Sequence, residues 1–151
     1  MIITFCGHSQ IFNGDEIKQK LSSVLEETVC GQDVEFLIGC YGDFDYIAAS
    51  CARAYKSMHP NCKVVLVTPY IHTKLQNNRL KSARDYYDEI VYPPLENVPY
   101  KFAIIKCNQW MVDKSDLVIA SVDCDWGGAF KTLDYACRKK KRFINLGKFE
   151  F

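Results

Sequence analysis

Two adjacent glycines in the second half of the chain have the setting of a phosphate-binding loop. Gly127 and Gly128 stand between an apolar run and a helix-forming segment, and Thr132 follows about one helical turn later. Glycines at such a point let the backbone approach a ligand closely, and free N–H groups at the start of a helix bind anions. The alternative is an ordinary tight turn. We predict that these three residues contact the phosphate of a nucleotide-type ligand.

Two aspartates could supply acid–base chemistry beside such a ligand. Cleavage of an N-glycosidic bond passes through an oxocarbenium-like state, which one carboxylate stabilises while a second group assists the leaving base. Asp45 is the candidate stabiliser and Asp123 the candidate acid or base. The alternative is structural, because carboxylates are favoured in the first turn of a helix and Asp43 is better explained as an N-cap than as a catalyst.

Further polar or glycine residues follow other apolar runs, where strands are expected to end. The additional candidates for binding the same ligand are Gly7, His8, Ser9, Gly42, Thr68 and Asn108. The first of these glycines does not begin a G-x-G-x-x-G pattern, and no acidic residue follows the second apolar run where the ribose of a dinucleotide would need one. Ordinary NAD-dependent dehydrogenase chemistry is therefore disfavoured.

The elements that must position these residues alternate along the chain. Short apolar runs predict strands over residues 2–6, 34–38, 63–68, 89–92, 117–121 and 143–146. Apolar residues at helical spacing indicate helices from Asn13 or Asp15 onward and over residues 43–58 and 102–114. The polar and charged residues 74–87 are expected to form a helix partly over solvent, and Gly127-Gly128 to open a last helix over residues 127–141. This alternation predicts an α/β fold, a single Rossmann-like three-layer domain over residues 1–151 with a mostly parallel sheet flanked by helices. Ligands of such sheets bind at the carboxyl ends of the strands.

Charge and composition narrow the class of partner. The 19 lysines and arginines nearly balance the 18 aspartates and glutamates, and the net charge of +1 argues against a general nucleic-acid binder. Residues 138–142 are all basic, and we interpret them as the solvated end of a helix. No apolar run approaches the ~20 residues of a membrane span, and the start of the chain has no basic leader, so we expect a cytoplasmic protein.

The cysteines and aromatic residues carry two further expectations. The eight cysteines include no C-x-x-C pair, which removes the common zinc and thioredoxin signatures, and we expect reduced thiols, no metal and no cofactor. Tyrosine, phenylalanine and tryptophan make up 13% of the chain. Because such residues are enriched at interfaces, this content favours a homodimer.

Five sequence features follow one another over nearly the whole chain. They are a first strand ending Gly7-His8, then Gly42-x-Phe44-Asp45, Asn108-Gln109-Trp110-Met111-Val112-Asp113 with Ser115-Asp116, Gly127-Gly128-x-x-x-Thr132-x-x-Tyr135-Ala136, and a last strand ending Ile144-Asn145-Leu146. The ordered set resembles the SLOG superfamily of Rossmann-like proteins, particularly its small bacterial members related to YpsA. LOG-type phosphoribohydrolases are distant kin of that group.

The resemblance implies a nucleotide-derived ligand at the carboxyl edge of the sheet, with Gly127, Gly128 and Thr132 at its phosphate. The hydrolases of the superfamily carry P-G-G-x-G-T-x-x-E. This chain has Phe130-Lys131 in place of the glycine and threonine, and Asp134 in place of the glutamate. The departure argues against hydrolase activity.

Three functional hypotheses follow. The favoured one is a protein that binds a nucleotide or an NAD- or ADP-ribose-like ligand, with Tyr70 and Trp126 in a base pocket. The alternative is a phosphoribohydrolase-like enzyme that cleaves or transfers N-glycosidic bonds of nucleotides. The third is an interaction protein that uses the basic residues 138–142. Under the favoured hypothesis the partner is a small molecule, and neither nucleic acid nor a membrane is expected.

Overall fold

The computed structural model describes residues 1–70 and 86–151, and the strands of this part form one parallel sheet. The strands are β1 (Ile2–Gly7), β2 (Val34–Ile38), β3 (Cys62–Val67), β4 (Glu89–Val91), β5 (Leu117–Ser121) and β6 (Arg142–Asn145). Their order across the sheet is β4-β3-β2-β1-β5-β6, and each neighbouring pair is parallel. At the centre, Thr4 of β1 lies opposite Leu37 of β2 and Val118 of β5.

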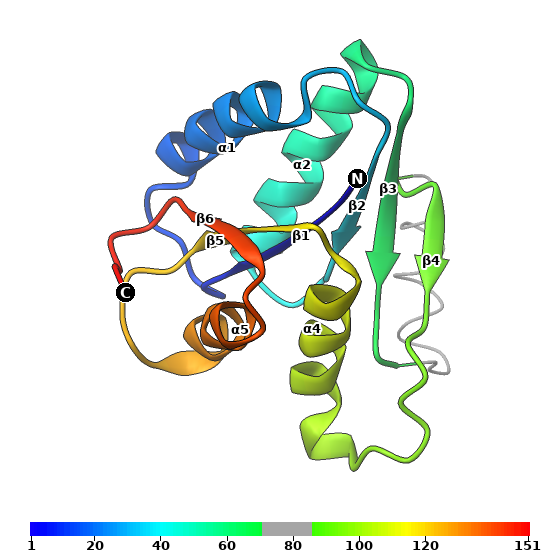
Figure 1. Cartoon of the computed structure of the whole chain (residues 1–151), viewed down its shortest axis with the longest axis vertical. Helices are drawn as coiled ribbons and strands as arrows, with labels where there is room; N and C mark the ends of the chain where they lie inside the picture. Colours follow the sequence, from blue (N-terminus) through cyan, green and yellow to red (C-terminus); the bar gives the residue numbers. More distant parts are fainter. Residues whose placement is uncertain (71–85) are drawn as a thin grey trace.

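Helices cover both faces of this sheet. They are α1 (Gly14–Val29), α2 (Asp43–Met58), α4 (Ala103–Lys114) and α5 (Gly127–Arg138), with a short 3-10 turn at Tyr100–Phe102. As Figure 1 shows, α1 and α2 lie together on one face, and α4 and α5 lie on the other. The predicted Rossmann-like α/β architecture is confirmed.

The burial of the central strands explains why their sequences are apolar without interruption. All five residues of β5 are buried, as are the four inner residues of β1, because helices cover these strands on both sides. The predicted apolar stripe of α2 faces the core at Phe44, Cys51 and Tyr55. Met58 was expected to belong to that stripe, but it lies exposed at the last position of the helix.

Most differences from the predicted elements concern their ends. The last helix stops at Arg138, short of the expected end near residue 141, because Lys140 adopts a left-handed conformation with φ of 56°. At α1, Asn13 takes the N-cap position, and Asp15 lies inside the first turn. The helix expected over residues 74–87 falls mainly on residues 71–85, outside the described part of the chain. Tyr86 and Tyr87, which are described, are not helical.

The strand order fixes where a ligand can bind. The chain runs outward from β1 through β2 and β3 to β4, and then returns to the other side of β1 to form β5 and β6. The connections after β1 and β5 therefore diverge to opposite faces of the sheet. In open α/β sheets a crevice forms at this point, outside the carboxyl ends of the strands.

Candidate functional site

A cavity of about 570 Å³ lies at this point of the sheet. Loops after β1, β2 and β5 line it together with α4 and the start of α5. Its volume is within the usual range of small-molecule sites, roughly 300–1,000 Å³. The structure brings nearly all the predicted site residues to this cavity: Gly7, His8, Ser9, Gly42, Asp45, Asn108, Asp123, Gly127, Gly128 and Thr132.

Thr68 is the predicted site residue that does not line the cavity. It is buried just beyond the end of β3, and its hydroxyl oxygen lies 3.5 Å from the phenol oxygen of Tyr41. The backbone N–H of Tyr70 also donates to that hydroxyl, over 3.4 Å. Tyr41 does line the cavity, so Thr68 supports a cavity residue and does not itself reach a ligand there.

The start of α5 presents open backbone to the cavity. Gly127 has a φ of +89°, which side-chain-bearing residues rarely adopt, and a Cβ at either Gly127 or Gly128 would meet no atom within 4 Å. Among the described residues no side chain caps this helix, because its N-cap residue is Trp126. The first N–H groups of α5 are therefore available to an acceptor in the cavity, where the helix dipole favours negative charge.

Thr132 lines the cavity in a different way from the one predicted. Its hydroxyl donates to the carbonyl of Gly128, 3.0 Å away and one turn earlier in the same helix. The residue is buried. Since that proton is already used, the hydroxyl of Thr132 has only its acceptor lone pairs left for a ligand, and these do not attract a phosphate.

Gly7 and Gly42 are needed for packing of the loops more than for contact with a ligand. A Cβ on Gly7 would lie 2.3 Å from a ring carbon of Phe44, and a Cβ on Gly42 would lie 2.7 Å from the Cα of Ser9. The loop is also joined to α2 by the N–H of Asp43, which donates to the carbonyl of Ser9. These contacts hold the loop after β1 directly against the start of α2.

The first turn of α2 contains two aspartates, Asp43 and Asp45, whose environments could not be predicted from the sequence. Gly42, not Asp43, occupies the N-cap position, which corrects the predicted cap. The carboxylate of Asp43 accepts the N–H of Ile11 over 2.9 Å and lies outside the cavity wall. Asp45 lines the cavity, and its Oδ2 accepts the N–H of Tyr41 over 2.9 Å. Desolvation raises the pKa of Asp45 to about 6, although the N–H groups of Tyr41 and Gly42 lower it.

Asp123 serves to join three segments of the chain. Its backbone N–H donates to Nε2 of His8 over 2.9 Å, which leaves the proton of the neutral imidazole on Nδ1. Its Oδ1 accepts the N–H of Lys148, also over 2.9 Å. The residue therefore links the loop after β1 to the loop after β5 and to the C-terminal segment.

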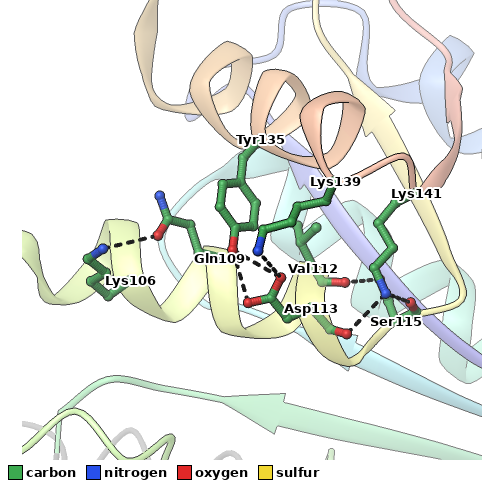
Figure 2. Close-up of polar contacts among 8 residues, drawn as sticks. All are labelled: Lys106, Gln109, Val112, Asp113, Ser115, Tyr135, Lys139 and Lys141. Carbon is green, nitrogen blue, oxygen red and sulfur yellow. Dashed lines mark hydrogen bonds and ion pairs between the residues drawn. The ribbon is translucent and has the colours of Figure 1, made fainter.

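A polar cluster fixes the two helices on this side of the cavity relative to each other. Figure 2 shows Tyr135 of α5 donating to both carboxylate oxygens of Asp113 on α4, each at 3.0 Å. Lys139 lies 4.0 Å from the same carboxylate. Lys141 donates to the carbonyls of Asp113 and Ser115. The cluster orients α4, which carries Asn108, against α5.

The same cluster accounts for part of the basic segment over residues 138–142. In addition to Lys139 and Lys141, Arg138 is paired with Asp134. Gln109, the neighbour of Asn108, accepts from Lys106 on the exposed side of α4. Among the described residues that line the cavity there is no lysine or arginine.

Two exposed aromatic residues that line the cavity, Phe12 and Trp126, were not among the site residues predicted from the sequence. The side chain of Phe12 is 97% exposed, and that of Trp126 is 72% exposed. Both line the cavity together with Tyr41. Trp126 was considered for a base pocket, but Phe12 was not. The available signal was a large apolar residue in the polar segment between β1 and α1.

Within the described residues, no three histidine, cysteine, aspartate or glutamate side chains are grouped so that they could hold a metal ion. In the same part of the chain, no helix has both the length and the apolar character needed to cross a membrane.

Comparison with known proteins gives one curated relative and two informative structures, while no family model matches. An uncharacterised SPbeta prophage-derived protein of Bacillus subtilis, YoqJ, is 26% identical over 145 residues, which cover 85% of this chain and 83% of that protein. DNA processing protein A from Helicobacter pylori, which binds single-stranded DNA, matches with a TM-score of 0.65, 15% identity and 96% of this chain. The Streptococcus pneumoniae protein of the same name matches with a TM-score of 0.64, 14% identity and 95% of this chain. This chain spans 64% and 49% of the lengths of these two structures.

These findings correct two predictions made from the sequence. The predicted NAD- or ADP-ribose-like ligand, with the phosphoribohydrolase-like alternative, is wrong, because the structural neighbours are DNA processing proteins and one of them binds single-stranded DNA. The expectation that nucleic acid is not a partner is wrong for the same reason. Its physical basis was the net charge of +1, but single strands are also bound by stacking on aromatic rings, which net charge does not report. At these identities the comparisons establish a shared Rossmann-like fold.

Proposed function

We propose that this protein binds single-stranded nucleic acid and that the cavity at the carboxyl ends of β1, β2 and β5 receives one nucleotide of the strand. The observation that carries the proposal is the combination of exposed aromatic rings with an uncapped helix start around one cavity. Phe12 and Trp126 supply the rings, and Gly127 and Gly128 supply the open backbone of α5. The likeness to a DNA processing protein that binds single-stranded DNA supports this proposal.

The aromatic residues suit the unpaired bases of a single strand. Phe12 is almost fully exposed and, within the described part of the chain, belongs to none of the hydrophobic core clusters; together with Trp126 it presents apolar surface at the cavity, and exposed apolar patches of this kind mark binding sites. Stacking of a base on an aromatic side chain contributes about 1–3 kcal/mol and does not depend on the base. Paired bases in a duplex present no such free face.

The phosphate of the bound nucleotide is assigned to the start of α5. The N–H groups there are uncapped, and the absence of a Cβ at Gly127 and Gly128 leaves room for a phosphate oxygen to approach. Because no lysine or arginine of residues 1–70 and 86–151 lines the cavity, these N–H groups are the main attraction for an anion that this part of the chain offers. The open helix start at Gly127 and Gly128, together with the ordered motifs of the sequence, supports assignment of residues 1–151 to one SLOG-like domain.

Binding of a fluorescein-labelled oligo(dT) of about 12 nucleotides, measured by anisotropy, tests the proposal. Wild type is compared with Phe12→Ala, Trp126→Ala and the control Phe151→Ala. Phe151 is also exposed, at 59%, but it packs against Phe130 and Phe143 and is not part of the cavity wall.

We expect the cavity variants to weaken binding by about 5- to 150-fold each, which corresponds to the loss of one stacked base. The control variant should bind like wild type, and a duplex of the same sequence should bind more weakly than the single strand. Equal affinities for all four proteins would show that the strand binds elsewhere. An absence of binding by wild type would refute the proposed function.

A further inference from the structure

The cavity contains an acceptor whose chemistry is suited to the edge of a base and unsuited to a phosphate. Asp45 lies in the cavity wall, in the first turn of α2, and its Oδ2 accepts the N–H of Tyr41. An ionised carboxylate has about four acceptor positions and no donor. The N–H groups of Tyr41 and Gly42 account for only part of this capacity, so the remaining positions can accept from a ligand.

The charge of Asp45 also orients the nucleotide in the cavity. A phosphate beside this carboxylate would place two negative charges together in a partly desolvated space, which is strongly unfavourable. At the start of α5, by contrast, Gly127 and Gly128 expose N–H groups that attract an anion. The phosphate therefore belongs at α5, and the base belongs near Asp45.

The four bases differ in what they offer to a carboxylate. The Watson–Crick edge of guanine carries two adjacent donors, the ring N1–H and the N2 amino group, which match the two oxygens of a carboxylate. Adenine and cytosine each carry one amino group beside a ring nitrogen that is an acceptor. Thymine carries one N–H between two carbonyl oxygens, which a carboxylate repels. An ionised acceptor thus favours guanine most and thymine least.

We propose that Asp45 makes the cavity selective for guanine, by accepting hydrogen bonds from N1–H and the N2 amino group of one base in a single strand. This inference rests on the proposed function, because it assigns the base contacts of the same site. Asp45 acts here as a specificity-determining residue and takes no part in a reaction. Stacking on Phe12 and Trp126 holds the base without regard to its type, and the carboxylate then distinguishes the bases.

The test uses competition for a labelled oligo(dT) by unlabelled oligonucleotides that differ at one central position. That position carries thymine, guanine, hypoxanthine or 7-deazaguanine. Hypoxanthine lacks the N2 amino group, whereas 7-deazaguanine keeps both donors. Oligonucleotides with guanine or 7-deazaguanine should compete about 5- to 150-fold better than the one with thymine. The oligonucleotide with hypoxanthine should compete better than thymine and less well than guanine.

Two variants locate the effect. Asp45→Asn replaces one acceptor oxygen by an amide donor, so the preference for guanine should be lost while binding of oligo(dT) persists. Asp43→Asn is the matched control. Asp43 lies two residues away from Asp45, and its carboxylate also accepts a backbone N–H but lies outside the cavity. The variant therefore removes the same charge without changing the cavity wall. This variant should keep the preference.

The outcomes separate the inference from the function on which it rests. If wild type binds oligo(dT) but ranks the four competitors equally, the selectivity is refuted and the proposed function stands. A guanine preference that survives in Asp45→Asn also refutes the assignment to this residue. If wild type binds none of the oligonucleotides, the proposed function fails and the inference fails with it. The base analogues act on the unmodified protein, so this part of the test does not depend on the folding of a variant.

Discussion

Replacing Asp45 by asparagine is expected to stabilise the folded protein, and the reason lies in the cavity wall. Desolvation raises the pKa of this carboxyl from 3.8 to about 6. A rise of about two pKa units corresponds to about 3 kcal/mol of free energy that the folded state loses when the group ionises. Such a cost in stability is typical of functional sites.

The sign of the pH dependence follows from the direction of the shift. Between about pH 4 and pH 6 the folded state holds the Asp45 proton more tightly than the unfolded state does. The free energy of unfolding therefore falls as the pH rises through this range. Below about pH 4 the carboxyl is protonated in both states and the penalty is absent, whereas above about pH 6 the penalty is fully present.

Urea denaturation of wild type and Asp45→Asn at about pH 8 and about pH 4 measures this penalty. The asparagine oxygen still accepts the N–H of Tyr41, but its amide group needs a partner of its own, which costs about 1 kcal/mol. We therefore expect a gain of about 1–2 kcal/mol at the higher pH and no gain at the lower one.

Other groups near Asp45 do not account for such a difference. Cys6 and Cys107 interact electrostatically with this carboxyl, but burial raises the pKa of each thiol to about 12, so both stay neutral in this range. Tyr87 has its pKa raised to about 12 in the same way. His8 also lines the cavity, but it is present in both proteins.

Asp43→Asn should lose a few tenths of a kcal/mol at the higher pH, because it removes a charge from a helix start. A variant Asp45→Asn that is no more stable than wild type at about pH 8 would refute the reasoning.

Three further expectations concern the loops, the helix pair and the charge. Gly42→Ala should destabilise the fold by about 1–3 kcal/mol, measured by thermal unfolding, because its Cβ would lie 2.7 Å from the Cα of Ser9. Gly128→Ala should fold normally but weaken oligonucleotide binding, measured by anisotropy. Tyr135→Phe removes the donor to Asp113 and should lower the free energy of unfolding by about 1 kcal/mol in urea titrations, and an unchanged value would show that the cluster does not hold α4 against α5. The logarithm of the binding constant should fall with the logarithm of the salt concentration with a slope of about −1 or less in magnitude, whereas a slope near −3 would indicate that residues 138–142 carry the binding.

The fold could be predicted from the sequence because its central strands are unusually uniform. Strands β1 and β5 are buried on both faces, so their sequences contain no polar alternation, and only a parallel sheet covered by helices explains such runs. The position of the cavity followed from the same argument, because the carboxyl ends of the strands can be recognised by the residues that follow them. The end of α5 could not be predicted, since the left-handed backbone of Lys140 is not a common property of lysine.

The direction of individual side chains was beyond the sequence. Thr132 was expected to contact a phosphate, but a threonine in a helix can donate its hydroxyl proton to the carbonyl one turn earlier, as it does here with Gly128. Asp43 and Asp45 are two residues apart in one helical turn, and only packing shows that the second of them faces the cavity. The ligand class failed for another reason. A phosphate at a glycine-rich helix start is common to free nucleotides and to nucleic acids, and the sequence motifs do not distinguish the two.

Photochemical cross-linking tests most directly whether the cavity at the carboxyl ends of β1, β2 and β5 holds a single-stranded base. An oligo(dT) with one 5-iodouracil, which reacts with aromatic side chains in contact with it, is irradiated with the protein, and the adduct is located by peptide mass spectrometry. Our account predicts adducts at Phe12, Tyr41 or Trp126, the aromatic residues of the cavity wall that are exposed. Adducts confined to peptides from the basic residues 138–142, or at aromatic residues outside the cavity, would contradict it.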